Sequence, residues 1–387
     1  MAKIEKKSHP PIRLGIVGAG GFARETLAVL GPEGCPDVTV VAIADRDREV
    51  AESTAHRFGA KPFVDVRSMM VESGVEAVMM SLPHDVYPEY VRLAAQHGLH
   101  LLKEKPLARS LDEALALVDA YANTDRVFMI ATQRRFSRGF AAMKDHLASA
   151  GRPLLVRSHF LFNRPGDFGW RGQKGKAGFG AFGNAGYHNI DLLNWLFGPP
   201  LEVFALHSSG GRDKPVHPYD TDDTGLCVLH YRGGLMGYLA CSWVTQPELL
   251  DVIVHGSAGT LTASAEGFRQ LDLAGNTVEE QSGDPATVAA EMMRAKVAAF
   301  AAAIRAGKKN YPCSARENVI TQAVIEAAYM SSRTGQPQHP ARVFELHGRS
   351  IEEFSASASP REAGPAAGGE APPQPPVKPS RGRSTRG

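Results

Sequence analysis

The chain is poor in cysteine and in long apolar runs. It holds four cysteines in 387 residues, and none of them forms a CxxC pair: Cys35, Cys227, Cys241 and Cys313. This spacing suggests neither a zinc knuckle nor a disulfide framework, so we expect no metal site and a reducing compartment. No stretch has the apolar length needed to cross a bilayer, and the N-terminal MAKIEKKSHPP lacks the apolar h-region of a signal peptide. We therefore expect a cytoplasmic protein without a membrane partner.

The chain also has little net charge. Lysine and arginine number 43 against 41 aspartates and glutamates, a formal charge of +2. Much of the basic excess lies near the C-terminus, at Lys378, Arg381, Arg383 and Arg386, so the rest of the chain is close to neutral. Binding to nucleic acid depends on lysines and arginines that displace counterions. The composition therefore argues against a nucleic-acid partner.

The N-terminal third has the alternating pattern of an α/β domain. The length of the whole chain favours two domains, because a chain of 387 residues is longer than a single hydrophobic core usually accommodates. Short β-branched runs alternate with helical segments, which is typical of a parallel sheet with helices on both faces. We predict a doubly wound Rossmann domain over residues 11–135, with strands at 12–17, 38–44, 62–64, 75–82, 99–103 and 126–131.

The remainder predicts a different architecture. Glycine-rich turns separate strands at 153–162, 201–208, 225–231, 235–244, 250–255, 259–263 and 268–273, and helices are expected at 184–197, 287–306 and 314–332. We predict an α+β domain over 136–345 for substrate binding and oligomerisation: a large, mostly antiparallel open sheet with helices on one face. The free face is a candidate interface for a homodimer or homotetramer. The Pro/Gly/Arg-rich segment 355–387 is expected to be disordered.

A glycine-rich motif follows the first expected strand. It reads Gly18-Ala19-Gly20-Gly21-Phe22-Ala23, a G-x-G-x-x-A pattern between a strand and a helix. In this setting Gly18 permits a tight turn, Gly20 lets backbone N–H groups approach a pyrophosphate, and Ala23 lets the helix pack closely on the sheet. The motif therefore predicts a dinucleotide site, with Gly21 and Phe22 beside the cofactor.

Two residues after the second expected strand bear on the choice of cofactor. Asp45 lies a little over 20 residues past the motif, where a carboxylate can accept both ribose hydroxyls and would repel a 2′-phosphate. Arg46 could stack on adenine or bind that phosphate. We predict NAD, with NADP possible.

Three segments carry a family resemblance. GIVGAGGFA, SLPHDVYPEYVRLAAQHGLHLLKEKPLA and GAFGNAGYHNIDLLNWLFG resemble the Gfo/Idh/MocA family of sugar and cyclitol oxidoreductases, over roughly residues 11–345. The resemblance implies that Lys105 of the EKP box is the catalytic lysine beside the nicotinamide, next to Glu104, and that the Lys105–Pro106 bond is a candidate for cis. It also implies that the loop Leu82-Pro83-His84 lies near the nicotinamide, although His84 and Tyr87 depart from the family's asparagine and histidine.

The helix expected at 184–197 supplies the second part of the site. Asn184, His188 and Asp191 share one helical face, and G-x-H-x-x-D is the family pattern that begins at Gly186. Oxidation of an alcohol needs a base, and we predict His188 in that role with Lys105 stabilising the alkoxide. The family has aspartate where this chain has Asn184. Three interpretations stay open: Asn184 positions substrate or His188, Asp191 or Tyr187 takes over the electrostatic role, or turnover is slowed or lost.

The segment that begins at Trp170 resembles the family's substrate loop. Trp170 could stack on a sugar ring and Arg171 could donate to hydroxyls, while Tyr187 and Asp191 are further candidates for substrate contact. The predicted activity is NAD(P)-dependent hydride transfer with a hydroxyl carbon of a sugar, cyclitol or related polyol. A non-catalytic NAD(P)-binding sensor or regulator, and a redox-neutral lyase or glycosidase that oxidises transiently, are the alternatives.

Overall fold

Six parallel strands form the first sheet of the computed structural model, which describes residues 9–31, 33–214, 216–307 and 310–355. Their order is β3-β2-β1-β4-β5-β6, which confirms the Rossmann prediction. The strands are β1 (Ile12–Val17), β2 (Val38–Ala44), β3 (Lys61–Phe63), β4 (Ala77–Met80), β5 (His100–Glu104) and β6 (Phe128–Ala131). β4 and β5 are buried throughout, as expected for strands covered on both faces. The tail expected at 355–387 lies outside the described residues beyond Ser355.

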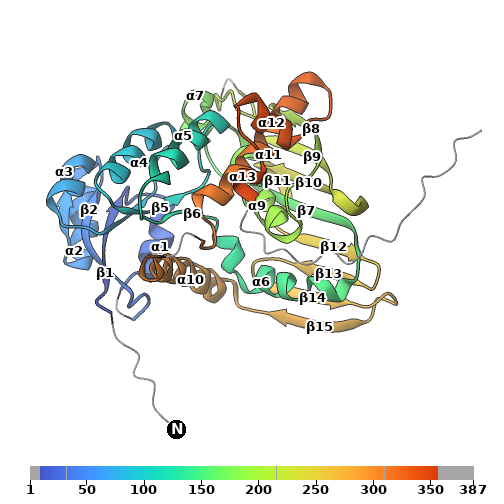
Figure 1. Cartoon of the computed structure of the whole chain (residues 1–387), viewed down its shortest axis with the longest axis horizontal. Helices are drawn as coiled ribbons and strands as arrows, with labels where there is room; N and C mark the ends of the chain where they lie inside the picture. Colours follow the sequence, from blue (N-terminus) through green and yellow to red (C-terminus); the bar gives the residue numbers. More distant parts are fainter. Residues whose placement is uncertain (1–8, 32, 215, 308–309, 356–387) are drawn as a thin grey trace, which may run out of the picture. The chain divides into compact units, whose positions relative to one another are not determined.

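Helices cover both faces of this sheet. Leu27 of α1 (Ala23–Val29), Ala55 of α2 (Arg48–Phe58) and Phe300 of α10 (Pro285–Ala306) share one core cluster. The other face is covered by α3 (Val66–Glu72), α4 (Tyr87–Gln96) and α5 (Leu111–Ala122). Figure 1 shows α10 beside α1 although the two are far apart in the sequence. The chain therefore returns to complete the first domain's core, and the boundary at residue 135 stays a prediction.

The second sheet is mixed and mostly antiparallel, as predicted. Its order is β15-β14-β13-β12-β7-β10-β9-β8, with β11 also paired to β7 and only the β7–β10 pair parallel. The strands are β7 (Pro153–Asn163), β8 (Glu202–Ser208), β9 (Thr224–His230), β10 (Met236–Ser242), β11 (Val244–Leu249), β12 (Val252–Gly256), β13 (Thr260–Ala263), β14 (Gly267–Leu271) and β15 (Thr277–Ser282). The strand expected at 235–244 divides at Trp243, and β15 was not expected.

One face of this sheet packs against helices. α6 (Arg138–Asp145), α9 (Gly186–Phe197) and α11 (Ala315–Thr334) contact it, and the short α8 (Ala181–Asn184) precedes α9, so the helix expected at 184–197 is interrupted at Ala185. The described chain also contains α7 (Lys174–Ala177), α12 (Pro340–Leu346) and α13 (Glu352–Ser355). On the strands, Leu206, Leu226, Val228 and Met236 remain exposed.

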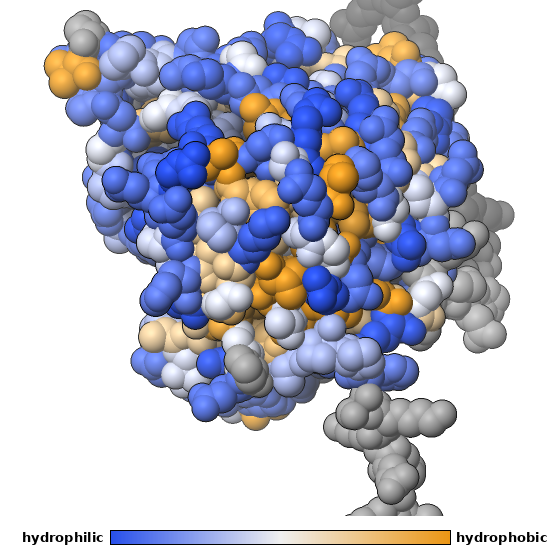
Figure 2. Space-filling view, turned by 90° about the vertical axis from the view of Figure 1, so that its left-hand side faces the viewer, coloured by the Kyte–Doolittle hydropathy of each residue, from blue (hydrophilic) through white to orange (hydrophobic). Residues whose placement is uncertain are grey.

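The outer surface of the first domain is mostly polar. Figure 2 shows the side of the molecule where α2 and α3 lie in Figure 1; hydrophilic residues dominate there and hydrophobic ones gather toward the middle. Among the described residues, no helix combines the length and apolar character that crossing a membrane requires.

Candidate active site

The glycine-rich loop has the geometry that a bound dinucleotide requires. Gly18 has a φ of 82°, and a Cβ there would lie 2.3 Å from the Ser81 backbone oxygen, so no other residue fits. A Cβ on Gly20 would meet no heavy atom within 4 Å, which leaves its backbone open to an approaching ligand. Ala23 is 1% exposed and packs into the core under the loop. These residues fit the phosphates of a dinucleotide.

Asp45 ties the second strand to this loop. Its Oδ2 accepts a hydrogen bond from the Ala19 backbone N–H at 2.9 Å, and its Oδ1 accepts one from Asp47 at 3.0 Å. A carboxylate has about four acceptor positions, so both oxygens keep capacity for a ribose diol. Arg46, the next residue in the chain, is exposed to solvent. The predicted cofactor contacts at this position are therefore compatible with the structure.

A pocket collects most of the predicted reacting residues. All but Ser81 of its lining were named from the sequence. The pocket is formed by Phe22, Ser81, Leu82, His84, Tyr87, Glu104, Lys105, Trp170, Arg171 and Asn184. The lining comes from the glycine-rich loop, the carboxyl ends of β4 and β5 with the residues that follow them, and, in the second domain, a 3₁₀ turn at Gly169–Gly172 and the end of α8. Ligands of open α/β sheets bind at this edge. Pro83 belongs to the same loop as Leu82 and His84.

Lys105 is held from two sides. Its Nζ donates to the backbone oxygen of Asn184 at 2.8 Å and to Asn184 Oδ1 at 2.9 Å, and the Phe22 ring centroid lies 5.9 Å away. The Lys105–Pro106 peptide is cis, as the resemblance implied. Burial lowers the pKa of Lys105 to about 7; the Glu104 carboxylate opposes this shift and the Arg171 guanidinium adds to it. A mixture of amine and ammonium is therefore present near neutral pH.

The contact between Lys105 and Asn184 is compatible with the neutral amine. A neutral lysine has two N–H groups and one lone pair, and two oxygens of Asn184 accept from the nitrogen. The lone pair then remains available to a third partner. Because Asn184 is an amide and carries no charge, it stabilises an ammonium less than a carboxylate would.

His188 lies close to this pair but outside the pocket lining. It is 5% exposed, its ring stacks on Phe160 with centroids 6.2 Å apart, and its Nδ1 has no hydrogen-bond partner among the described residues. Burial lowers the pKa of His188 well below 6.5, and the nearby charges of Lys105 and Arg134 lower it further. The imidazole is therefore neutral and keeps one polar atom free.

His84 joins the two domains above the pocket. Its Nδ1 donates to the Ala177 backbone oxygen at 2.8 Å, and its ring meets Trp170 edge-on with centroids 4.5 Å apart. Burial, followed by the charges of Lys103 and Lys105, lowers the pKa of His84 well below 6.5. The departure from the family's asparagine thus places a neutral ring that packs against the segment before Ala177.

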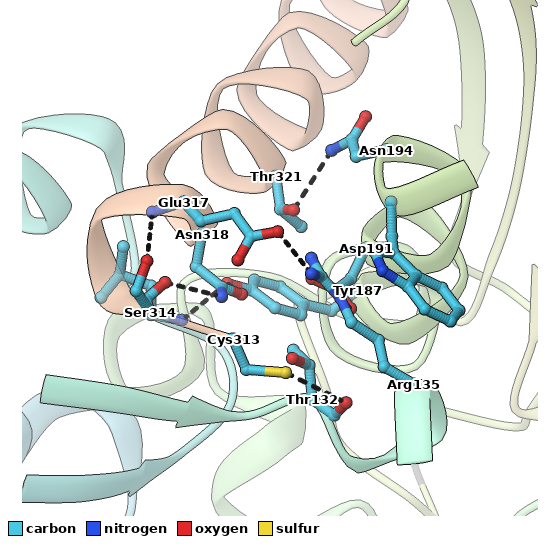
Figure 3. A network of polar contacts seen from close by, with 12 residues as sticks. Thr132, Arg135, Tyr187, Asp191, Asn194, Cys313, Ser314, Glu317, Asn318 and Thr321 are labelled. Carbon is cyan, nitrogen blue, oxygen red and sulfur yellow. Dashed lines mark hydrogen bonds and ion pairs between the residues drawn. The ribbon is translucent and has the colours of Figure 1, made fainter. Parts of the chain in front are cut away.

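Two of the expected substrate contacts are corrected by the structure. Both oxygens of Asp191 are bound by Arg135, at 2.6 and 2.7 Å, and Arg135 also pairs with Glu317 of α11 (Figure 3). The Tyr187 hydroxyl donates to Asn318 Oδ1 at 3.0 Å and accepts from the Leu107 N–H. Neither side chain is more than 1% exposed. Asp191 and Tyr187 therefore stabilise the contact between α9 and α11 and do not face a ligand.

Sequence reasoning also missed a buried lysine behind the pocket. Lys296 of α10 is fully buried; its Nζ donates to Thr26 Oγ1 at 2.8 Å and lies 3.5 Å from Glu104 Oε1. A lysine on the apolar side of a long helix was the available signal. Within the described ranges, no group of His, Cys, Asp and Glu side chains is arranged to hold a metal ion.

Comparisons with known proteins identify the family of the chain. Residues 12–132 match the Gfo/Idh/MocA oxidoreductase family profile for the NAD-binding Rossmann fold, and residues 140–262 match the Gfo/Idh/MocA C-terminal domain. Levoglucosan dehydrogenase of Pseudarthrobacter phenanthrenivorans is 29% identical over 60% of this chain and 66% of that protein. 1,5-Anhydro-D-fructose reductase of Ensifer adhaerens is 26% identical over 84% of this chain and 97% of that protein.

A solved structure shows the same fold. Levoglucosan dehydrogenase in complex with NADH superposes with a TM-score of 0.77 at 23% identity, over 85% of this chain and 99% of that one. The two family profiles together span the strands of the Rossmann sheet and, in the second sheet, the strands from β7 to β12 and most of β13. The chain therefore belongs to the Gfo/Idh/MocA family and is an NAD-binding oxidoreductase of the sugar and polyol dehydrogenase type.

Proposed function

We propose that this protein oxidises a secondary hydroxyl of a sugar, cyclitol or related polyol with NAD. The observation that carries the proposal is the bond from Lys105 Nζ to both oxygens of Asn184, in a pocket at the carboxyl edge of the Rossmann sheet. The nicotinamide of NAD supplies the hydride acceptor when it is bound. The residues of the chain must then position the hydroxyl and remove its proton.

We assign to Lys105 the role of the base that accepts the proton of the substrate hydroxyl. A base works best when its pKa is near the operating pH, and the pKa of Lys105 is about 7. Its neutral amine donates two hydrogen bonds to Asn184 and offers its lone pair to the substrate hydroxyl. After proton transfer, the ammonium stabilises negative charge that remains on the substrate oxygen.

His188 takes a different role from the one expected. Burial, and then the cations around it, make its imidazolium form unfavourable, so it is a poorer proton acceptor than Lys105. The neutral ring has a free Nδ1 and sits beside the reacting pair, which suits a hydrogen bond to a substrate hydroxyl. Asn184 positions Lys105 in this proposal.

A turnover screen separates this proposal from its alternatives. Purified protein with NAD and a panel of sugars, cyclitols and polyols should form NADH with at least one of them. Net conversion of a substrate without NADH, detected by product analysis, would indicate transient oxidation in a lyase or glycosidase. Tight NAD binding with neither outcome would indicate a sensor or regulator.

Replacing Asp45 with alanine should weaken NAD more than NADP. The carboxylate pairs with a free ribose diol and repels a 2′-phosphate, so its loss should lower NAD affinity by about tenfold and change the preference between the cofactors. Dissociation constants for both cofactors measure this. Asp45 also holds the Ala19 N–H, so loosening of the loop would affect both cofactors alike.

Asp47→Ala provides the matched control. Asp47 accepts from Glu49 and Val50 at the start of α2 and lies two residues from Asp45. The Asp47→Ala variant should leave the ratio of NAD to NADP affinity unchanged. An equal loss for both cofactors in the Asp45 variant would show that Asp45 does not read the 2′ position.

We also propose that the uncovered face of the second sheet joins copies of this chain into a homodimer or homotetramer. Leu206, Leu226, Val228 and Met236 are 57%, 46%, 50% and 57% exposed, on three adjacent strands. An apolar patch of this kind is typical of an interface.

Leu226→Glu should therefore lower the molar mass measured by light scattering to that of a monomer. Leu273→Glu changes a 75% exposed residue between β14 and β15 and should have no effect; a monomeric unmodified chain would exclude the proposal.

A further inference from the structure

A second lysine, Lys103, is buried just before the EKP box. It lies in β5, whose five residues are all buried, and its side chain is fully buried. Its neighbours across the sheet are Met80 of β4 and Ile130 of β6. Apolar residues are typical of a parallel strand that is covered on both faces. In the described part of the chain, no ion pair includes Lys103, so its charge needs another partner.

Three contacts surround the Lys103 nitrogen. Its Nζ donates to the backbone oxygen of Glu104 at 2.9 Å and to the backbone oxygen of Pro106, and it lies 3.5 Å from the centroid of the Tyr87 ring. An ammonium has three N–H groups, which match two carbonyls and one ring face. A neutral amine would direct its lone pair at the negative face of the ring. The contacts therefore favour the ammonium, against the burial that lowers the pKa of Lys103 to about 7.

The two carbonyls that Lys103 binds lie on either side of Lys105. The Glu104 oxygen belongs to the peptide group that contains the Lys105 N–H, and the Pro106 oxygen belongs to the group that contains the Leu107 N–H. Lys103 therefore fixes the backbone both before and after the reacting lysine. Because the backbone sets the direction in which a side chain leaves it, these bonds help to place the Lys105 Nζ.

Tyr87 connects this turn to the loop after β4. Its hydroxyl accepts from the Leu82 N–H at 3.0 Å and donates to the Met80 backbone oxygen at 3.4 Å. Tyr87 and Leu82 both line the pocket with Lys105. The resemblance gives histidine at the position of Tyr87. A protonated imidazole would repel the Lys103 ammonium, whereas the face of a phenol ring attracts it.

We propose that Lys103 is a positioning residue of the reaction, whose ammonium fixes the turn that carries Lys105 and ties this turn, through the Tyr87 ring, to the loop at Leu82. That loop is expected beside the nicotinamide, so the tie holds the proton acceptor in a fixed place relative to the cofactor. Reacting groups that are misplaced by about 1 Å lose much of their effect. This inference rests on the proposed function, since it concerns how the base of that function is held.

Replacing Lys103 with methionine removes the donors and the charge but keeps much of the side-chain volume. With the sugar or polyol that yields NADH in the turnover screen, kcat should fall about 10- to 100-fold, the scale of a misplaced reacting group. The affinity for NAD, measured by calorimetry, should change by less than about threefold. Lys61→Met is the matched control, because Lys61 also lies over an aromatic ring, 4.8 Å from the Phe63 centroid, but is exposed on β3. It should leave kcat unchanged.

A double-mutant cycle tests whether Lys103 acts through Lys105. In the Lys105→Met background, Lys103→Met should lower the residual kcat by less than about twofold, because no reacting amine remains to be misplaced. A general loss of structural support would lower kcat by the same factor in both backgrounds. Equal factors would overturn the proposal, as would a Lys103→Met variant whose turnover matches that of the unmodified chain.

Two variants of Tyr87 test the same contact from the other side and serve if Lys103→Met does not fold. Tyr87→Phe keeps the ring face and loses the hydroxyl, whereas Tyr87→Leu loses both. The kcat of Tyr87→Leu should be at least about tenfold below that of Tyr87→Phe. Equal rates would exclude the contact between the ring and Lys103 from any role in the reaction. Thermal melting verifies that each variant is folded.

Hydrogen exchange tests the inference without a substrate. The amides of Lys105 and Leu107 belong to the peptide groups that Lys103 binds, so in the full-length Lys103→Met variant they should exchange at least about tenfold faster than in the unmodified chain. Unchanged exchange would overturn the inference and leave the dehydrogenase assignment intact. Faster exchange in a protein that forms no NADH from any sugar or polyol would support the hold on the turn and count against the proposed function.

Discussion

Replacing Lys105 with methionine should lower kcat by about 10²- to 10⁴-fold, the scale of removing a general base. Methionine keeps much of the side-chain volume but has neither a lone pair on nitrogen nor a charge. NAD affinity should be largely retained, because the contacts expected from Gly18, Gly20 and Asp45 lie elsewhere. Steady-state kinetics and NAD titration of the same preparation measure both quantities.

Lys105→Arg distinguishes a base from a fixed positive charge. Arginine keeps the donors to Asn184 but does not deprotonate in this pH range. If Lys105 is the proton acceptor, the arginine variant should be about as impaired as Lys105→Met. Recovery of activity by arginine would mean that the cation alone matters and would return the role of base to His188. Wild-type turnover in Lys105→Met would remove Lys105 from the reaction altogether.

The fold was predictable where the sequence pattern is local. The runs VTVVAIA and HLLKE predict buried parallel strands, because most of VTVVAIA is apolar and HLLKE joins two leucines directly to the turn that carries the EKP box. β11 and β15 were missed for the opposite reason. Val244–Leu249 includes Pro247 and Thr277–Ser282 is polar, so neither has the alternation by which a strand is recognised.

The site was predictable where a motif names the residue, and less so where its partner is distant in sequence. Helical spacing places Asn184, His188 and Asp191 on one side of a helix, but it does not show what packs against each turn. The structure places Lys105 against Asn184, whereas Arg135 and Glu317 surround Asp191. Lys296 reaches Glu104 from a helix about 190 residues later in the chain. Such contacts are fixed by tertiary packing, and no local pattern encodes them.

The exchange of the family's aspartate for Asn184 now has a physical consequence. The family pattern led us to expect an effect on His188, but the structure shows that Asn184 binds Lys105 through both its oxygens. A carboxylate at this position would form an ion pair with the ammonium and stabilise the protonated lysine. The amide does so less, and the surrounding arginines oppose protonation further. Asn184 therefore keeps Lys105 available as a base near neutral pH.

Asn184→Asp should accordingly raise the pKa of Lys105 above about 7 and shift the acidic limb of kcat for oxidation to higher pH. Oxidation requires the neutral amine, so activity is present above the pKa of Lys105 and is lost as the pH falls through it. Half of Lys105 is neutral at pH 7 when its pKa is about 7, so an upward shift of one to two units predicts a loss of about 5- to 50-fold at pH 7 that is recovered at alkaline pH. Reduction of the corresponding ketone needs the ammonium and should keep its rate to higher pH.

Asn194→Asp is the matched control, because it adds the same charge to α9 ten residues beyond Asn184, where Asn194 donates to Thr321. Its pH profile should follow that of the unmodified chain.

Faster oxidation by Asn184→Asp at pH 7 would contradict our assignment, because it would mean that the new carboxylate assists His188 as the base. A profile that does not move would show that the protonation state of Lys105 does not control the step. A loss of kcat at every pH, without recovery under alkaline conditions, would mean that Asn184 contacts the substrate directly and that its amide is needed as a donor.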